Sequence, residues 1–324
     1  MDNFFIHFVL CNITIGLFVL ILLCMKRIFK HCLTPRMQFN LWIPFTISLL
    51  VPFLPVSFST LSTKMQDLFH PLAHFSHTVH TTNTSEYTSS STNQIYDYAI
   101  SMRTRFPAYI STIFCVIWGI GMFVMLFSFV RSLVLLHHMR RTANLMQDKR
   151  IHAIYMTCLS ELQLRKSIPL YSSSIIDTPV STGILRPAIF LPLHCISNFE
   201  EQEIRYILLH ELMHCYYKDA IFNYCMNIIR ILYWFHPLIW LITKEFYTER
   251  ELACDTSVLR LLGANEQISY GVTLLHFVDK QTNTPLSLLN NLSENAKQMK
   301  RRILNIKQHQ PLTIQKKLRS ILSF

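Results

Sequence analysis

Glycine and acidic residues are scarce in this chain of 324 residues. It contains six glycines and 19 acidic residues, against 30 basic residues and a 51% share of apolar residues. It has no glycine-rich loop of the kind that binds phosphate, and no internal repeat. A chain this apolar and this poor in glycine departs from the composition of ordinary soluble proteins. The composition therefore predicts that part of the chain lies in a membrane.

Phe4 to Met25 and Tyr109 to Val130 contain no Asp, Glu, Lys or Arg. Each is long enough to cross about 30 Å of hydrocarbon as a helix. The first lacks the basic start and small-residue cleavage site of a secretory signal, so we expect it to remain in the protein. Another candidate, Phe39 to Phe58, lies between these two in the chain and would be the second span. It contains three prolines, and neighbouring helices would have to satisfy the backbone hydrogen bonds that these prolines interrupt. We predict three membrane spans.

No acidic residue lies in the segment between the first two spans. That segment contains Lys26, Arg27, Lys30 and Arg36, and the third span is followed by basic residues at 131, 140 and 141. The positive-inside rule then puts the amino terminus outside and everything after the third span in the cytoplasm. Because the basic residues follow span ends, attraction to anionic lipid is a better reading of them than a nucleic-acid groove. We expect membrane lipid as a partner and no direct contact with nucleic acid.

Cysteine is absent from 59–108, the longest segment predicted to lie outside, so we expect no structural disulfides and reduced cytoplasmic cysteines. This segment is rich in Ser, Thr, Asn and His, a composition that cannot bury a core of its own. Four of its histidines recur at three and four residues. They could face a metal ion from a short helix or be incidental in a solvated loop: His70, His74, His77 and His80.

Taken along its whole length, the sequence predicts five regions. They are 1–58 with the first two spans and a basic cytoplasmic loop, 59–108 as an extracellular loop, 109–139 with the third span, 140–289 as the cytoplasmic working domain, and 290–324 as a basic juxtamembrane segment that could lead to a fourth span. Within the working domain, helical spacing occurs over 151–166, 200–219 and 237–262, the last stopped by Gly263. Residues 169–192 read as strands broken by turns, with Pro179 favouring an edge strand.

The stretch LLHELMHCYYKD, residues 208–219, contains a motif with metal-ligand spacing. His210 and His214 are four residues apart, so both rings can reach one zinc ion from the same helix face. In H-E-x-x-H sites the acid beside the first histidine, here Glu211, is the general base that takes a proton from the attacking water. Histidines that merely hydrogen-bond in a buried helix are the alternative. We predict a zinc endopeptidase.

A catalytic zinc site needs a third protein ligand, and Glu251 in ERELACD is the best candidate. Asp255 lies one turn further on the same face, where it could accept the free N–H of a ligand histidine. Asp219 could orient the helix end or a ligand, or could be a surface acid. Glu245 and Glu249 compete with Glu251 on spacing, but we expect them on a solvated face together with Lys244 and Arg250. Cys215 and Cys254 are expected to be core thiols rather than ligands.

The apolar run from Ala220 to Thr243 tests this ligand set, because a membrane crossing there would put Glu251 on the side opposite the two histidines. Arg230 and the break at His236 and Pro237 disfavour a straight crossing. We predict two helices packed at the membrane surface that return Glu251 to the histidines.

Four segments in order, STGILRPAIFLP, LLHELMHCYYKD, YWFHPLIW and ELACD, resemble the BlaR/MecR-type membrane zinc metallopeptidases, the antirepressor family that senses β-lactams. The resemblance covers nearly the whole chain. It implies a mainly α fold of several transmembrane helices with a cytoplasmic, gluzincin-like α+β zinc metalloprotease domain. It assigns His210, His214 and Glu251 as zinc ligands and Glu211 as the base. It also implies that an edge strand pairs with extended substrate: Val180, Ser181, Thr182, Gly183 and Ile184.

The resemblance also implies a protein substrate, which is the chain itself or a cytoplasmic repressor, and a homodimer is a possible assembly. Arg301 and Arg302 stand where the family cuts itself, although they could equally be plain juxtamembrane charge. The S-x-x-K and K-T-G motifs of a penicillin-binding domain are absent, so we expect either a receptor fragment or a member that senses another signal. Two other readings stay open: a housekeeping membrane zinc protease, and a non-catalytic receptor with structural zinc, against which an intact Glu211 argues.

Overall fold

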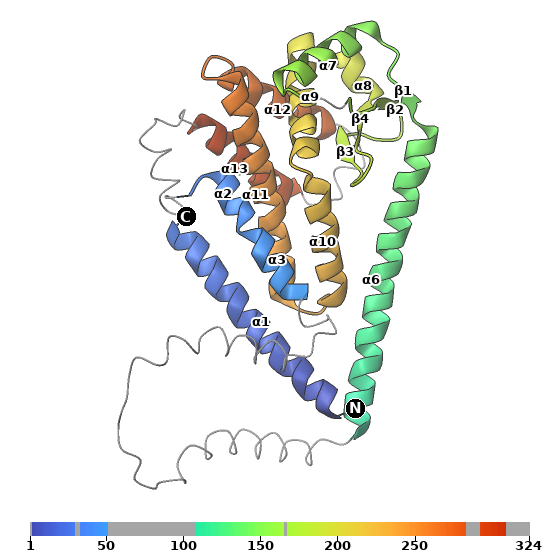
Figure 1. Ribbon diagram of the computed structural model, residues 1–324, viewed down its shortest axis with the longest axis vertical. Helices are drawn as coiled ribbons and strands as arrows, with labels where there is room; N and C mark the ends of the chain where they lie inside the picture. The colour runs from blue at the N-terminus through green and yellow to red at the C-terminus, as the bar shows by residue number, and fades with distance from the viewer. Residues whose placement is uncertain (1, 30–32, 51–107, 165–166, 283–291, 309–324) are drawn as a thin grey trace, which may run out of the picture. The chain divides into compact units, whose positions relative to one another are not determined.

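The computed structural model describes residues 2–29, 33–50, 108–164, 167–282 and 292–308 (Figure 1). The four loop histidines, residues 51–58 of the second candidate span and the last sixteen residues lie outside these ranges. By contacts within the chain, two compact units form, 1–20 with 47–121, and 21–46 with 122–324. Helices dominate the described residues, so the prediction of a mainly α fold is confirmed. The five predicted regions remain a prediction.

Helices occupy the described parts of all three candidate spans. They are α1 (Asp2–Phe29), α3 (Trp42–Leu50) and α6 (Ala108–Thr142). Among the described residues, one helical stretch is long and apolar enough to cross a membrane, Thr112–Thr142, with a mean hydropathy of 2.5. Its apolar side chains, such as Ile120 and Phe127, are mostly exposed, as expected of a helix that faces lipid.

The second candidate span begins later than predicted, because a separate short helix, α2 (Pro35–Asn40), precedes α3. The Thr34 side chain caps α2, and Pro35 occupies its first turn. The chain turns at Leu41, and α3 then starts with Pro44 in its own first turn. A proline has no N–H to donate and is tolerated only there, so the break falls just before it.

The second unit contains the elements of the predicted working domain. Its helices are α7 (Lys149–Glu161), α8 (Leu193–Asn198), α9 (Glu201–Tyr216), α10 (Asp219–Leu232), α11 (Pro237–Leu262), α12 (Gln267–Thr282) and α13 (Leu292–Lys307). The helix predicted over 151–166 ends early, because Gln163 adopts a left-handed conformation with φ of 51°. The break at Tyr233–His236 separates α10 from α11, and these helices lie side by side (Figure 1). The prediction of two helices here is confirmed.

A four-stranded sheet packs beside α9 and has the order β1-β2-β4-β3. The strands are β1 (Asn144–Leu145), β2 (Leu170–Ser173), β3 (Val180–Thr182) and β4 (Ala188–Pro192). The central strand β4 is buried throughout and is paired on both sides, in parallel with β2 and antiparallel with β3. β3 forms the edge of the sheet among the described residues, as Pro179 predicted. Gly183 follows it with φ of +100°, where an added Cβ would lie 2.4 Å from the carbonyl oxygen of Arg186.

Helix α9 is central to the core. Its residues Ile204, Leu208, Leu209 and Leu212 are fully buried, and it packs on α7, α11, α12 and the sheet. A capping box at Glu200 satisfies the first backbone N–H groups of the helix. Because one side of every turn lies in the core, the rotation of α9 about its axis is fixed, and with it the direction of its polar side chains.

Candidate metal centre

The polar side chains of α9 and α11 converge in one buried place. His210 and His214 come from successive turns of α9, and their Nε2 atoms lie 3.2 Å apart. Glu251 of α11 faces both, with Oε2 3.3 Å from Nε2 of His210 and Oε1 3.8 Å from Nε2 of His214. The structure thus brings together the three residues that the sequence predicts as ligands.

The other ring nitrogen of each histidine contacts an oxygen. Nδ1 of His214 lies 2.7 Å from Oδ2 of Asp219, and Nδ1 of His210 lies 3.0 Å from the hydroxyl of Tyr270 and 3.4 Å from Oδ1 of Asp255. These contacts favour the tautomer with hydrogen on Nδ1, which leaves the lone pair of each Nε2 directed at Glu251. Asp219 is 2% exposed, so the alternative of a surface acid is wrong.

Cys254 also lies within reach of the histidines. Its sulfur and the two histidines form a cluster whose potential ligand atoms all lie within 4.8 Å of one another. The sulfur is 3.5 Å from Nδ1 of His210 and 3.4 Å from that residue's carbonyl oxygen. Glu251 instead faces Nε2 of both histidines. We therefore favour Glu251 over Cys254 as the third ligand, since Nδ1 of His210 is occupied by Tyr270.

Two imidazoles and one carboxylate are the donor set of a His₂Glu zinc site, and buried carboxylates orient both rings. The residues present therefore fit a zinc ion. Burial disfavours a charged His214, but Cys254, Glu251 and the hydrogen bond to Asp219 outweigh that effect and raise its pKa to about 10. Burial disfavours an ionised Glu251, but Arg250 and His214 outweigh it and hold the pKa of Glu251 well below its ordinary value. Protons and metal consequently compete for the histidines.

The predicted solvated face on α11 is wrong for two residues. Glu249 is buried and pairs with Lys26, and it accepts a hydrogen bond of 2.6 Å from the indole N–H of Trp42. Arg250 donates to Oε1 of Glu251 at 2.6 Å and to Oδ1 of Asn223. The physical reason is that α2 and the start of α3 pack against α11 and cover that face.

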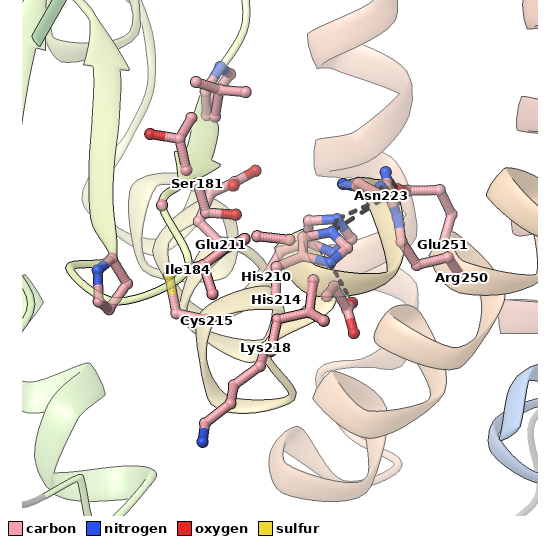
Figure 2. A pocket seen from close by; sticks show the side chains of 18 of the residues that line it. Ser181, Ile184, His210, Glu211, His214, Cys215, Lys218, Asn223, Arg250 and Glu251 are labelled. Atoms are coloured by element: carbon pink, nitrogen blue, oxygen red, sulfur yellow. Dashed lines mark hydrogen bonds and ion pairs between the residues drawn. The ribbon is translucent and has the colours of Figure 1, made fainter. Parts of the chain in front are cut away.

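A cavity of about 660 Å³ opens beside the convergent residues. Figure 2 shows His210 and His214 between Ser181 and Ile184 on one side and Arg250 and Glu251 on the other. The whole predicted edge, 180–184, lines this cavity. Glu211 also lines it and is 8% exposed, so its carboxylate is shielded from bulk water.

Arg301 and Arg302 lie inside α13 rather than in an extended segment. Arg301 pairs with Glu245 at 2.9 Å, and both side chains are about one third exposed. Arg302 is largely buried, with its Nε and Nη2 donating to the two oxygens of Asp255 at 2.8 and 2.7 Å. Self-cleavage here stays a prediction, but a bond in this place must leave its helix before a protease can bind it as a strand.

Sequence reasoning did not identify Tyr270, Arg250 and Arg36 as residues of the site. Tyr270 donates its hydroxyl hydrogen to Oδ1 of Asp255 at 2.7 Å and so joins α12 to the site. Tyr270 and Arg36 lie outside the quoted motifs, and Arg250 lies in ERELACD, where it was expected on a solvated face. The one available signal was indirect, namely that a buried acid such as Asp255 needs a donor from elsewhere in the chain.

Comparison with known proteins gives a family match and several relatives. The family model described as BlaR1 peptidase M56 matches residues 6–306. The regulatory protein BlaR1 of Bacillus licheniformis is 30% identical over 326 residues, covering 100% of this chain and 54% of that protein. The methicillin resistance mecR1 protein of Staphylococcus aureus (strain Mu50) is 26% identical over 253 residues, or 74% of this chain and 40% of its own length. The chain spans about half the length of the curated relatives that it matches.

Proposed function

Because the chain belongs to the BlaR1 peptidase M56 family, we propose that it is an integral membrane zinc endopeptidase that transduces a signal. The resemblance read from the four sequence motifs is confirmed by this membership. The ligands in the proposal are His210, His214 and Glu251, and the general base is Glu211. The observation that carries the proposal is the convergence of both Nε2 atoms on one carboxylate at the wall of a cavity that Glu211 also lines.

Bound zinc would supply Lewis-acid polarisation of the peptide carbonyl and acidify a water molecule. The chain's own residues do the rest. Glu211 accepts a proton from the water as its oxygen bonds to the carbonyl carbon, and returns that proton to the amide nitrogen as the C–N bond breaks. Asp219 and Asp255 keep the ligand histidines in the tautomer that directs Nε2 toward Glu251.

The substrate in this proposal is an extended polypeptide. β3 carries its free edge along the cavity, and a peptide that pairs with Val180–Thr182 would lay its backbone across the cavity toward Glu211. Main-chain pairing gives affinity with little sequence preference, so side chains along the cavity would set the specificity. We propose that the substrate is the chain itself or a cytoplasmic repressor, in keeping with the regulatory and resistance names of the relatives.

The proposed topology has the amino terminus outside and the zinc domain in the cytoplasm. It is supported by the apolar helix Thr112–Thr142 and by the basic residues that lie between the first two spans and after the third. Membrane lipid and a second copy of the chain are further proposed partners.

The test uses the full chain expressed in membranes as wild type, Glu211→Gln and Glu201→Gln. Glu201 is a matched control, because it is an exposed acid on the same helix. Bound zinc is quantified, and cleavage of the chain and of an added extended peptide library is followed by mass spectrometry. We expect zinc in all three proteins, with cleavage lost only in Glu211→Gln.

Three results would contradict the proposal. Absence of zinc from all three proteins would remove the metal site. Zinc in all three with cleavage that Glu211→Gln leaves intact would remove Glu211 as the base. Zinc in all three with no cleavage of any substrate would favour a binding-only receptor over an enzyme.

A further inference from the structure

The carboxylate beside each proposed ligand histidine faces an arginine from a distant part of the chain. On one side the order is His210, Asp255 and Arg302, and Arg302 belongs to α13. The guanidinium holds both carboxylate oxygens, at 2.8 and 2.7 Å, which is the bidentate geometry of the strongest arginine pairs. Asp255 has no exposed surface, so this arginine and Tyr270 replace the water that it loses.

On the other side the order is His214, Asp219 and Arg36, and Arg36 belongs to α2. Its guanidinium lies 3.4 Å from the centre of the Tyr217 ring, and Nη1 is 3.9 Å from Oδ1 of Asp219. These two atoms are buried and have no hydrogen-bond partner among the described residues. The contact is thus an ion pair that is about 1 Å longer than a hydrogen bond.

Helix α2 is held in this place by contacts apart from Arg36. Phe39 is 1% exposed and packs against the rings of Phe222 on α10 and Phe246 on α11. Close by, Lys26 at the end of α1 pairs with Glu249, two residues before Glu251. The described parts of the basic segment between the first two candidate spans, Lys26 and α2, therefore dock on the helices that carry the metal centre.

We propose that Arg302 and Arg36 are positioning residues for the metal centre, so that zinc affinity depends on the docking of α13 and α2. This inference rests on the proposed zinc site. A carboxylate that loses its arginine turns toward water or another donor, and the histidine it orients then loses its alignment. Arg302 forms two hydrogen bonds with Asp255, whereas Arg36 lies 3.9 Å from Asp219. Removal of Arg302 therefore lowers zinc affinity more than removal of Arg36.

The experiment measures zinc affinity of the full chain in detergent by competition with a chromophoric chelator. The variants are Arg302→Gln, Arg302→Lys and Arg36→Gln. The matched controls are Arg301→Gln, the neighbour whose ion pair is about one third exposed, and Arg27→Gln, an exposed arginine at the end of α1. Cobalt replaces zinc in parallel samples, because its visible absorption reports the arrangement of the ligands.

We expect Arg302→Gln to bind zinc about 10-fold more weakly than wild type, which is the usual cost of losing an outer partner of a metal ligand. Its cobalt spectrum should change as well. Arg302→Lys keeps the positive charge but not the two parallel N–H donors of the guanidinium, so its zinc affinity should lie between those of Arg302→Gln and wild type. Arg36→Gln should lose less than Arg302→Gln, and both controls should match wild type.

Thermal melts of the zinc-free proteins identify any variant that fails to fold, and Arg302→Lys then decides the question. The proposal is overturned when folded variants at position 302 match wild type in zinc affinity and cobalt spectrum. It is also overturned when Arg301→Gln loses as much affinity as Arg302→Gln. A wild-type chain that binds no zinc would instead contradict the proposed function.

Discussion

Because protons and metal compete for the same histidines, the zinc affinity should rise with pH. Neighbouring groups raise the pKa of His214 from 6.5 to about 10 and that of His210 well above 6.5, despite the opposing effect of burial. The His214 ring is then protonated at neutral pH when no metal is bound, and the raised pKa of His210 favours its protonated form too. Each protonated ring must release a proton before Nε2 can bind zinc. Below the raised pKa, each released proton makes the apparent affinity rise about tenfold per pH unit. When both rings release a proton, the apparent zinc affinity rises about 100-fold per pH unit.

The measurement is the zinc affinity of the detergent-solubilised chain between about pH 7.5 and 8.5, corrected for proton binding by the competing chelator. Ordinary histidines are already neutral in this range and would give almost no slope. Asp219→Asn removes the carboxylate that bonds to Nδ1 of His214 and so lowers the pKa of that ring, while Cys254 and Glu251 still raise it; the slope should therefore be lower than that of wild type. An affinity that is independent of pH above about pH 7.5 would refute the reasoning, because both rings would then be neutral.

Three further predictions concern stability in detergent. Lys26→Met should lower the unfolding free energy by about 3 kcal/mol because it leaves the Glu249 carboxylate buried without its cation, and adding Glu249→Gln should restore part of the loss in a double-mutant cycle. Gly183→Ala should cost about 1 to 3 kcal/mol and weaken peptide binding, since φ of +100° disfavours alanine beside β3. Leu209→Ala should cost about 2 to 5 kcal/mol by opening a cavity beside the metal helix, whereas Leu185→Ala, at 93% exposure, should change the melting temperature little.

Local signals in the sequence were sufficient for much of this fold. The helix α11 runs from Pro237 to Leu262 as predicted, because a proline favours a helix start and Gly263 a helix end. Pro179 correctly indicated an edge strand. The spacing of His210 and His214, together with the resemblance that assigned Glu251, selected three side chains that do converge.

Contacts between distant segments could not be predicted in the same way. Glu249 was expected in solvent because its neighbours on α11 are charged, yet residues more than 200 positions earlier in the chain bury it. The ion pair between Arg302 and Asp255 joins α13 to α11, and the residue periodicity of neither helix predicts it. Periodicity reports which face of a helix is apolar, but it does not report which distant side chain will neutralise a buried charge.

The location of Arg302 within α13 has a kinetic consequence. A protease that binds its substrate as a strand can cut only the fraction of molecules in which this helix has melted and Arg302 has left Asp255. Every 1.4 kcal/mol of opening free energy lowers that fraction about tenfold. If the chain cuts itself at this pair, the observed rate is the rate of the chemical step multiplied by the fraction of molecules in which α13 is open. Any event that destabilises α13 would then raise the rate of self-cleavage.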